Sequence, residues 1–209
     1  MIDIRHKTTR DILRQVPADT LAGQYLSGAK LAGANLAKLD LSNADLQRAD
    51  LRDADLTGAN LQGALLAGAL LTGAICDGAN LARADLTDTF AVGVGFHGAN
   101  LVSAVLRYAK LSEADFSQAN LTHADLSMAE LACDFCGANL TKADLRGSNL
   151  AGAVLDGAVL LGANLQDAKL AGADIANARL EGALMGGGRR VGAQVFKKKE
   201  ARPWWQFWS

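Results

Sequence analysis

The chain has 209 residues, 50% of them apolar and 5% aromatic, and 21 Lys and Arg nearly balance 22 Asp and Glu. This near neutrality excludes a generally basic nucleic-acid binder and a chain too charged to collapse. No apolar run reaches the roughly 18 residues of a membrane span. The polar start MIDIRHKTTR lacks the apolar stretch of a secretory signal, and three cysteines form no disulfide framework. We therefore expect a cytoplasmic protein.

Residues 1–20 precede a long repeat, and we expect them to cap its N-terminal end. Ile2 to Arg5 alternates like a short strand, and the segment 11–13 can pair with it across a polar turn at 6–10. A short helix from Thr9 to Val16, with Thr9 as its N-cap, is the competing interpretation. We favour the hairpin.

A five-residue repeat fills residues 21–187. Of 34 positions spaced five apart from Leu21 to Met185, with a single step of four from Leu131 to Phe135, 27 are Leu. Ala occupies the second position before these in 27 of the 34 cases, and the intervening residue is most often Asp or Asn. A period of five fits neither the 3.6 residues of a helical turn nor the alternation of a strand.

Four such units form a longer repeat of about 20 residues, a length typical of one turn of a solenoid. Its clearest marker is a series of asparagines whose numbers rise by 20, 20, 20 and then 19: Asn60, Asn80, Asn100, Asn120 and Asn139. We expect about eight stacked square coils with Leu and Ala inside. The asparagines then form a ladder whose amides hydrogen-bond along the axis, and Phe96, Phe116 and Phe135 stack in the interior.

The units Ala44-Asp45-Leu46-Gln47-Arg48 and Ala54-Asp55-Leu56-Thr57-Gly58 resemble those of pentapeptide-repeat proteins. The resemblance covers about residues 21–187. It implies an all-β fold, a right-handed quadrilateral parallel β-helix, and an elongated molecule, but it implies no activity. Some members of the family, including quinolone-resistance proteins, resemble DNA in shape and charge and bind DNA gyrase.

Two departures from the repeat are candidate sites. At 89–95 (TFAVGVG) one unit loses both its Ala and its Leu, and Phe90 takes an outward position near Leu70, Ile75 and Val92. These four residues form a candidate partner-binding patch, although local repacking or a small bulge that covers its own apolar residues is the favoured explanation. In Cys133-Asp-Phe-Cys136 we expect Cys133 to point inward and Cys136 outward, as two ordinary thiols rather than a redox or metal pair.

Charge is distributed unevenly. Residues 21–188 carry a net charge of −7, whereas residues 189–209 carry +5. The longer repeat places two groups of acids on two sides of the coil. The first group is Asp45, Asp85, Asp88, Asp125, Asp144 and Asp167, and the second is Asp55, Asp77, Asp115, Asp134, Asp156 and Asp174.

Residues 188–209 form a basic tail that holds all three tryptophans. Its aromatic residues are a candidate contact for a partner or a second copy: Phe196, Trp204, Trp205, Phe207 and Trp208. The tail can cap the last coil, join another subunit, or dock transiently on an anionic membrane surface. These alternatives remain open at the level of sequence.

The sequence contains no phosphate-binding loop, nucleophile elbow or H-E-x-x-H motif, and its three histidines lie far apart. We expect no enzyme, no cofactor, no metal and no direct nucleic-acid binding. The favoured function is that of an interaction or scaffold protein with an unknown protein partner and a possible homodimer through the tail. The alternative, taken from the family, is a DNA-mimicking binder of DNA gyrase.

Overall fold

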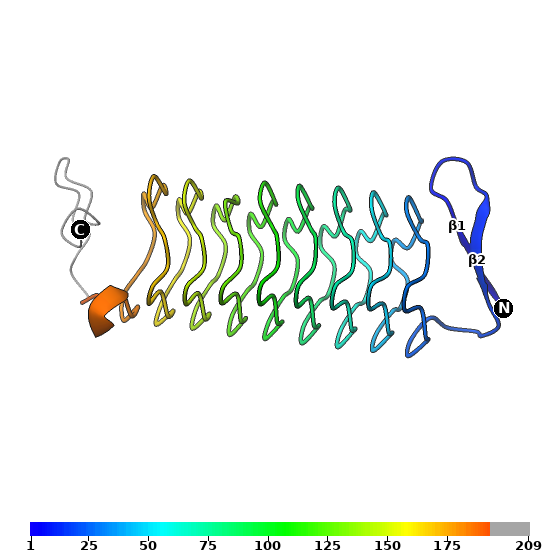
Figure 1. Cartoon of the computed structure of the whole chain (residues 1–209), viewed down its shortest axis with the longest axis horizontal. Coiled ribbons are helices and arrows are strands. Elements are labelled where there is room, and N and C mark those ends of the chain that lie inside the picture. The colour runs from blue at the N-terminus through cyan, green and yellow to red at the C-terminus, as the bar shows by residue number, and fades with distance from the viewer. Residues whose placement is uncertain (193–209) are drawn as a thin grey trace.

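The computed structural model describes residues 1–192, and it confirms the right-handed quadrilateral β-helix (Figure 1). The elements in chain order are β1 (Ile2–Arg5), β2 (Ile12–Val16) and a 3-10 turn, η1 (Gly186–Gly188). Between β2 and η1 each side of a coil contributes one bridging residue, which pairs in parallel with its equivalent one coil along. The result is a rod with the hairpin at one end and η1 at the other.

The four sides of the rod are numbered here by their columns of bridging residues. The columns of sides 1, 2, 3 and 4 begin at Tyr25, Lys30, Asn35 and Asp40. Tyr25 pairs with Asp45, a step of 20, and the step falls to 19 where a pair spans the shortened unit, as in Asp115 with Asp134. The columns therefore stay in register past the missing residue.

Local hydrogen bonds explain the residue types of the repeat. The Asp or Asn before each Leu accepts the N–H group two residues further on, as Asp45 Oδ1 does from Gln47 at 3.0 Å. This Asx turn bends the chain at the corner. The last residue of each five-residue unit has a positive φ, whether it is a glycine such as Gly58 (63°) or another residue such as Arg48 (55°). Corner geometry thus overrides the ordinary preference against left-handed backbone.

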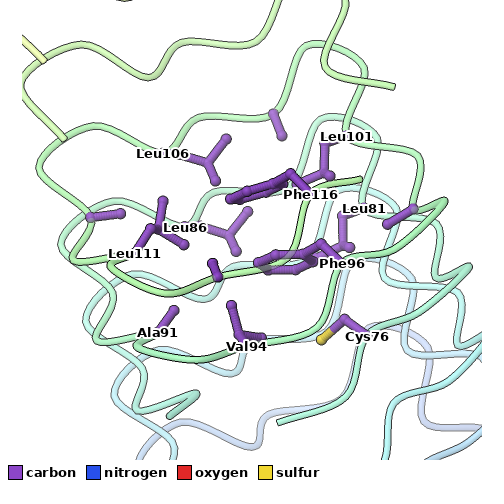
Figure 2. Close-up of a cluster of buried hydrophobic side chains, with 14 of the residues drawn as sticks. Cys76, Leu81, Leu86, Ala91, Val94, Phe96, Leu101, Leu106, Leu111 and Phe116 are labelled. Atoms are coloured by element: carbon purple, nitrogen blue, oxygen red, sulfur yellow. The ribbon is translucent and has the colours of Figure 1, made fainter. Parts of the chain in front are cut away.

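The interior is a continuous column of apolar side chains. From Leu26 to Ala163 the Leu and Ala positions of the repeat are almost fully buried, except for the partly buried Leu39 at an Ala position. Phe96, Phe116 and Phe135 stack as predicted, with ring centroids 4.9 and 5.1 Å apart. These spacings match the roughly 4.8 Å between hydrogen-bonded strands. Figure 2 shows Phe96 and Phe116 one above the other, with Cys76 next to Phe96.

An antiparallel hairpin of β1 and β2 covers the N-terminal end, with Ile2 opposite Val16. It is joined to the first coil by Lys7 N–H donating to the Gly33 carbonyl (2.8 Å) and by Asn35 N–H donating to the Arg5 carbonyl (2.8 Å). The helical alternative for residues 9–16 is wrong, because these residues form the hairpin turn and β2.

The shortened unit lies at the corner between sides 2 and 3. Only Ala132 separates Leu131 from Cys133, and Cys133 N–H donates to the Leu131 carbonyl at 2.8 Å. This tight turn replaces the usual two-residue corner. Cys133 therefore occupies the inward position that Ala fills in other units.

Candidate interaction surfaces

The predicted apolar patch is divided by a corner. Leu70 and Phe90 are bridge partners on side 2. The Phe90 side chain is 44% exposed, and the Lys110 Nζ lies 4.7 Å from the centroid of its ring. Val92 is 37% exposed at the following corner, and Ile75 is 39% exposed on side 3. Leu70 and Phe90 are thus direct neighbours, whereas Ile75 faces another direction.

The irregular unit around Phe90 is repacked inside without a bulge. Val94 takes the Ala position and is fully buried, and Thr89 is buried with its Oγ1 donating to the Leu86 carbonyl at 2.9 Å. The bridges of Phe90 and Gly95 to the next coil are retained. This repacking leaves Phe90 on the surface.

Exposed apolar residues also lie outside the predicted patch, and two of them are near Phe90 in the sequence and on the rod. Tyr108 and Met128 stand at the corner between sides 1 and 2 and are 46% and 54% exposed. The Arg107 guanidinium carbon lies 5.6 Å from the centroid of the Tyr108 ring. Their separation by one full coil was the signal for this pair in the sequence, and both occupy the last position of a unit. Leu70, Phe90, Tyr108 and Met128 are called the edge strip below.

The sides differ in charge. Side 3 and its corner hold six acids against one base, Lys38: Asp55, Asp77, Asp115, Asp134, Asp156 and Asp174. Side 1 also holds six acids, but it carries Arg48, Arg107 and Arg146 as well. Side 3 is therefore the most acidic surface of the rod.

Side 1 acids are partly neutralised by ion pairs. Arg146 binds Asp144 with an Nη2–Oδ2 distance of 2.5 Å, and the Arg107 Nε lies 3.9 Å from Asp125 Oδ2. Burial raises the pKa of Asp144, but hydrogen bonds from the Arg146 side chain and backbone outweigh it and hold this pKa below its usual value. The carboxylate of Asp144 is therefore paired with Arg146.

A polar column runs along the corner of side 3. Gly95 replaces the usual Asp or Asn and cannot bind the N–H of His97, so Asp77 of the preceding coil accepts it at 3.1 Å. The imidazole Nδ1 of His97 lies 2.8 Å from Ser117 Oγ. Cys136 follows Ser117 one coil further along. These groups are exposed or half-buried on a flat surface.

The cysteines differ in environment as expected. Cys133 is buried, its Sγ lies 2.8 Å from the Leu111 carbonyl, and burial raises the pKa of its thiol to about 12. Burial also raises the pKa of Cys76. Cys136 is half-buried, and all three thiols are free. A buried thiol with a raised pKa is a poor nucleophile. Among residues 1–192, no three His, Cys, Asp or Glu side chains gather as metal ligands.

The five asparagines of the ladder are consecutive bridge partners on side 4. The amide of Asn80 donates to Asn60 Oδ1 at 3.1 Å, and that of Asn100 donates to Asn80 Oδ1 at 3.0 Å. Asn60 donates in turn to Asp40 at 2.9 Å, which extends the ladder by one coil. Among residues 1–192 no amide hydrogen bond joins Asn120 to Asn100 or Asn139 to Asn120, so the predicted ladder is wrong for these two rungs. The side-chain oxygen of Asn120 accepts both the N–H and the hydroxyl of Thr122.

The aromatic tail residues Phe196, Trp204, Trp205, Phe207 and Trp208 lie outside the described residues. Within residues 1–192 there is no helix with the length and apolar character that crossing a bilayer requires.

Comparison with known proteins agrees with this geometry. The family model for pentapeptide repeats matches in eight copies, in ranges that extend from residue 25 to residue 187. HetL, a pentapeptide repeat protein involved in heterocyst differentiation regulation in the cyanobacterium Nostoc sp. strain PCC 7120, is 32% identical. The match covers 81% of this chain and 88% of HetL, with a TM-score of 0.34.

QnrB1, a plasmid-mediated fluoroquinolone resistance protein, is 22% identical over 79% of this chain and 88% of its own, with a TM-score of 0.55, and shares the fold. Rfr23 from the cyanobacterium Cyanothece 51142 is 35% identical over 46% of this chain and 63% of its own, with a TM-score of 0.24. No curated protein matches the sequence. Pentapeptide-repeat proteins are in general interaction or structural proteins rather than enzymes. The family model and the similarity to HetL show that this chain belongs to the pentapeptide-repeat family.

Proposed function

We propose that this protein is a non-enzymatic scaffold that binds a partner protein through the edge strip. The observation that carries the proposal is the exposure of Phe90 on side 2 and of Tyr108 and Met128 at the corner before it. Aromatic residues, Met and Arg are enriched where protein interfaces bury most of their surface. The strip contains Phe90, Tyr108 and Met128, and Arg107 flanks the Tyr108 ring.

The rigidity of the rod supports a binding role. Each coil is tied to the next by backbone hydrogen bonds on all four sides, such as Phe90 N–H to the Ala69 carbonyl at 3.1 Å. Side chains on such a frame lose little backbone freedom when a partner binds, which reduces the entropic cost of association. The rings are held further by their contacts with Lys110 and Arg107.

The test is capture of partners from a lysate of the organism of origin, with wild type and with the double variant Phe90→Ser/Tyr108→Ser. We expect a partner that wild type retains and the double variant loses. The matched control is Val154→Ser, which removes an equally exposed apolar side chain from side 3. Equal capture by all three proteins, each with the same far-UV circular dichroism, would refute the role of the edge strip.

Side 3 favours a second candidate, a DNA-mimicking protein that binds DNA gyrase. Its support is the excess of six aspartates over one lysine on a straight surface. Four of these acids are bridging residues of one column, so they project from equivalent positions of their coils. A basic surface that binds duplex phosphates can bind such a surface by the same long-range attraction.

Gyrase supercoiling with added protein tests this candidate. We expect inhibition by wild type and weaker inhibition by Asp115→Asn/Asp134→Asn, because asparagine keeps the Asx turn while removing the charge. The control Asp45→Asn/Asp85→Asn removes two charges from side 1. If wild type does not inhibit, the gyrase candidate is excluded and the edge-strip proposal is unaffected.

A further inference from the structure

The C-terminal end of the rod is open on three sides. In earlier coils the N–H groups of Leu150 and Gly152 donate to the next coil, to the carbonyls of Lys169 and Ala171 at 2.8 and 3.0 Å. The equivalent groups of the last coil, on Leu170 and Gly172, have no acceptor among residues 1–192. Within the same described range, this also holds for the N–H groups of Ile175, Asn177 and Leu180.

Interior side chains are uncovered at the same place. Leu170 and Ile175 occupy inward positions, yet they are only partly buried, as is Ala168. One coil earlier the equivalent residues Leu150 and Leu155 are almost fully buried. The last coil therefore presents an apolar floor. Around it are backbone N–H groups that have no acceptor in the described part of the chain. A free strand edge of this kind can pair with another chain segment.

The chain itself begins to close this end. After η1, Arg190 pairs antiparallel with Leu184, and Gly182 N–H donates to the Val191 carbonyl at 2.8 Å. Val191 packs against the core. The backbone thus turns back over side 1 and, at Val191, runs toward side 4, where the open edge begins.

We propose that residues 193–209 bind the open end of their own molecule and cover Leu170 and Ile175. The segment has 17 residues, and at about 3.3 Å per extended residue it is long enough to cross the three open sides, which span residues 168–180. Its five aromatic side chains can cover the apolar floor. It also carries four Lys and Arg against one Glu, opposite the exposed acids Asp167 and Asp174.

Tryptophan fluorescence of the full chain tests the proposal, because all three tryptophans belong to this segment. We expect an emission maximum blue-shifted from that of tryptophan in water and protection from acrylamide quenching. Leu170→Asp/Ile175→Asp should shift the emission to the red and remove the protection. The control Leu65→Asp changes an exposed residue on side 1 and should leave both unchanged. Water-like emission of wild type, or a double variant that behaves like wild type, would overturn the proposal.

Oligomeric state and vesicle binding distinguish the other occupants. We expect the emission and the mass from light scattering to stay constant on dilution. A dimer whose emission shifts to the red on dilution would assign the segment to a second copy and overturn binding within one molecule. A blue shift that requires phosphatidylserine vesicles, and is absent with phosphatidylcholine vesicles, would assign it to a membrane surface and overturn the proposal equally.

Truncation after Gly192 gives an independent check. Without the segment the free edge of the last coil is exposed, so we expect a lower melting temperature and end-to-end association that increases the mass. A truncated chain with the melting temperature and mass of the full chain would contradict the proposal.

Discussion

Replacing Phe116 by Ala tests whether the stacked rings stabilise the rod beyond the burial of their surface. Phe116 is fully buried and lies between Phe96 and Phe135. Its replacement removes one ring and interrupts two stacked pairs, whereas Phe96→Ala interrupts one. The two variants thus separate the contribution of stacking from that of burial.

The expected magnitudes follow from this geometry. Truncation of a buried Phe to Ala costs about 3–5 kcal/mol of unfolding free energy, because transfer free energy is lost and a cavity remains. An aromatic pair contributes about 0.5–1.5 kcal/mol beyond area, so Phe116→Ala should cost about 1 kcal/mol more than Phe96→Ala. Phe116→Leu should cost less than Phe116→Ala, because Leu fills this position in most units and leaves a smaller cavity.

Urea unfolding followed by far-UV circular dichroism measures these differences. Tryptophan fluorescence is unsuitable here, because all three tryptophans lie outside the coils. Equal losses for Phe116→Ala and Phe96→Ala would show that the stacked pairs add nothing. A loss below about 1 kcal/mol for Phe116→Ala would refute the reasoning about a close-packed interior.

Three further predictions concern the ladder, the thiols and acid stability. Asn80→Asp keeps the acceptor of the Asx turn but loses the amide donor to Asn60 in the preceding coil, so it should cost about 1 kcal/mol in urea unfolding, and less than Asn80→Ala. An alkylating reagent at neutral pH should label Cys136 in the folded protein and Cys133 only after unfolding, as peptide mass spectrometry will show. Because Arg146 lowers the pKa of Asp144 in the folded state, this carboxylate stabilises the fold above the unfolded pKa of about 4, and its contribution is lost as pH falls through the lower folded pKa. Melting temperatures should therefore fall less steeply below pH 4 in Asp144→Asn than in wild type.

Much of the fold was predictable because one physical solution is repeated. A repeat of about 20 residues fixes which side chains stack, so the ring column and the four sides follow from counting. The unit that ends at Ala132 is one residue short, which the sequence shows as a step of 19 instead of 20. The bridge between Asp115 and Asp134 shows that the columns stay in register across this unit.

Other features depend on contacts that no single unit contains. The binding of His97 N–H by Asp77 arises because Gly95, one coil later than Asp77, has no side chain to fill the Asx turn. The exposure of Tyr108 and Met128 depends on the direction in which a left-handed corner residue points. Counting along the repeat gives the column in which a residue stands. What the residue binds depends on which residue types occupy the neighbouring positions in the adjacent coil.

The positions that break the Asx rule point to the surface where function is to be sought. An apolar residue before the inward position cannot bind the following corner N–H, and indeed the N–H groups of Thr72 and Val92, after Leu70 and Phe90, donate to no side chain among residues 1–192. A lost turn or cap bond of this kind costs about 1 kcal/mol. Phe90 offsets little of this cost within the rod, because the residue is 44% exposed. A side chain that weakens its own corner and remains in solvent gains its apolar contacts only when another molecule covers it. Leu65, Ile75 and Val154 also break the rule, but each stands alone in its column, with no apolar bridge partner. Leu70 and Phe90 are bridge partners, so the edge strip is the surface to test first.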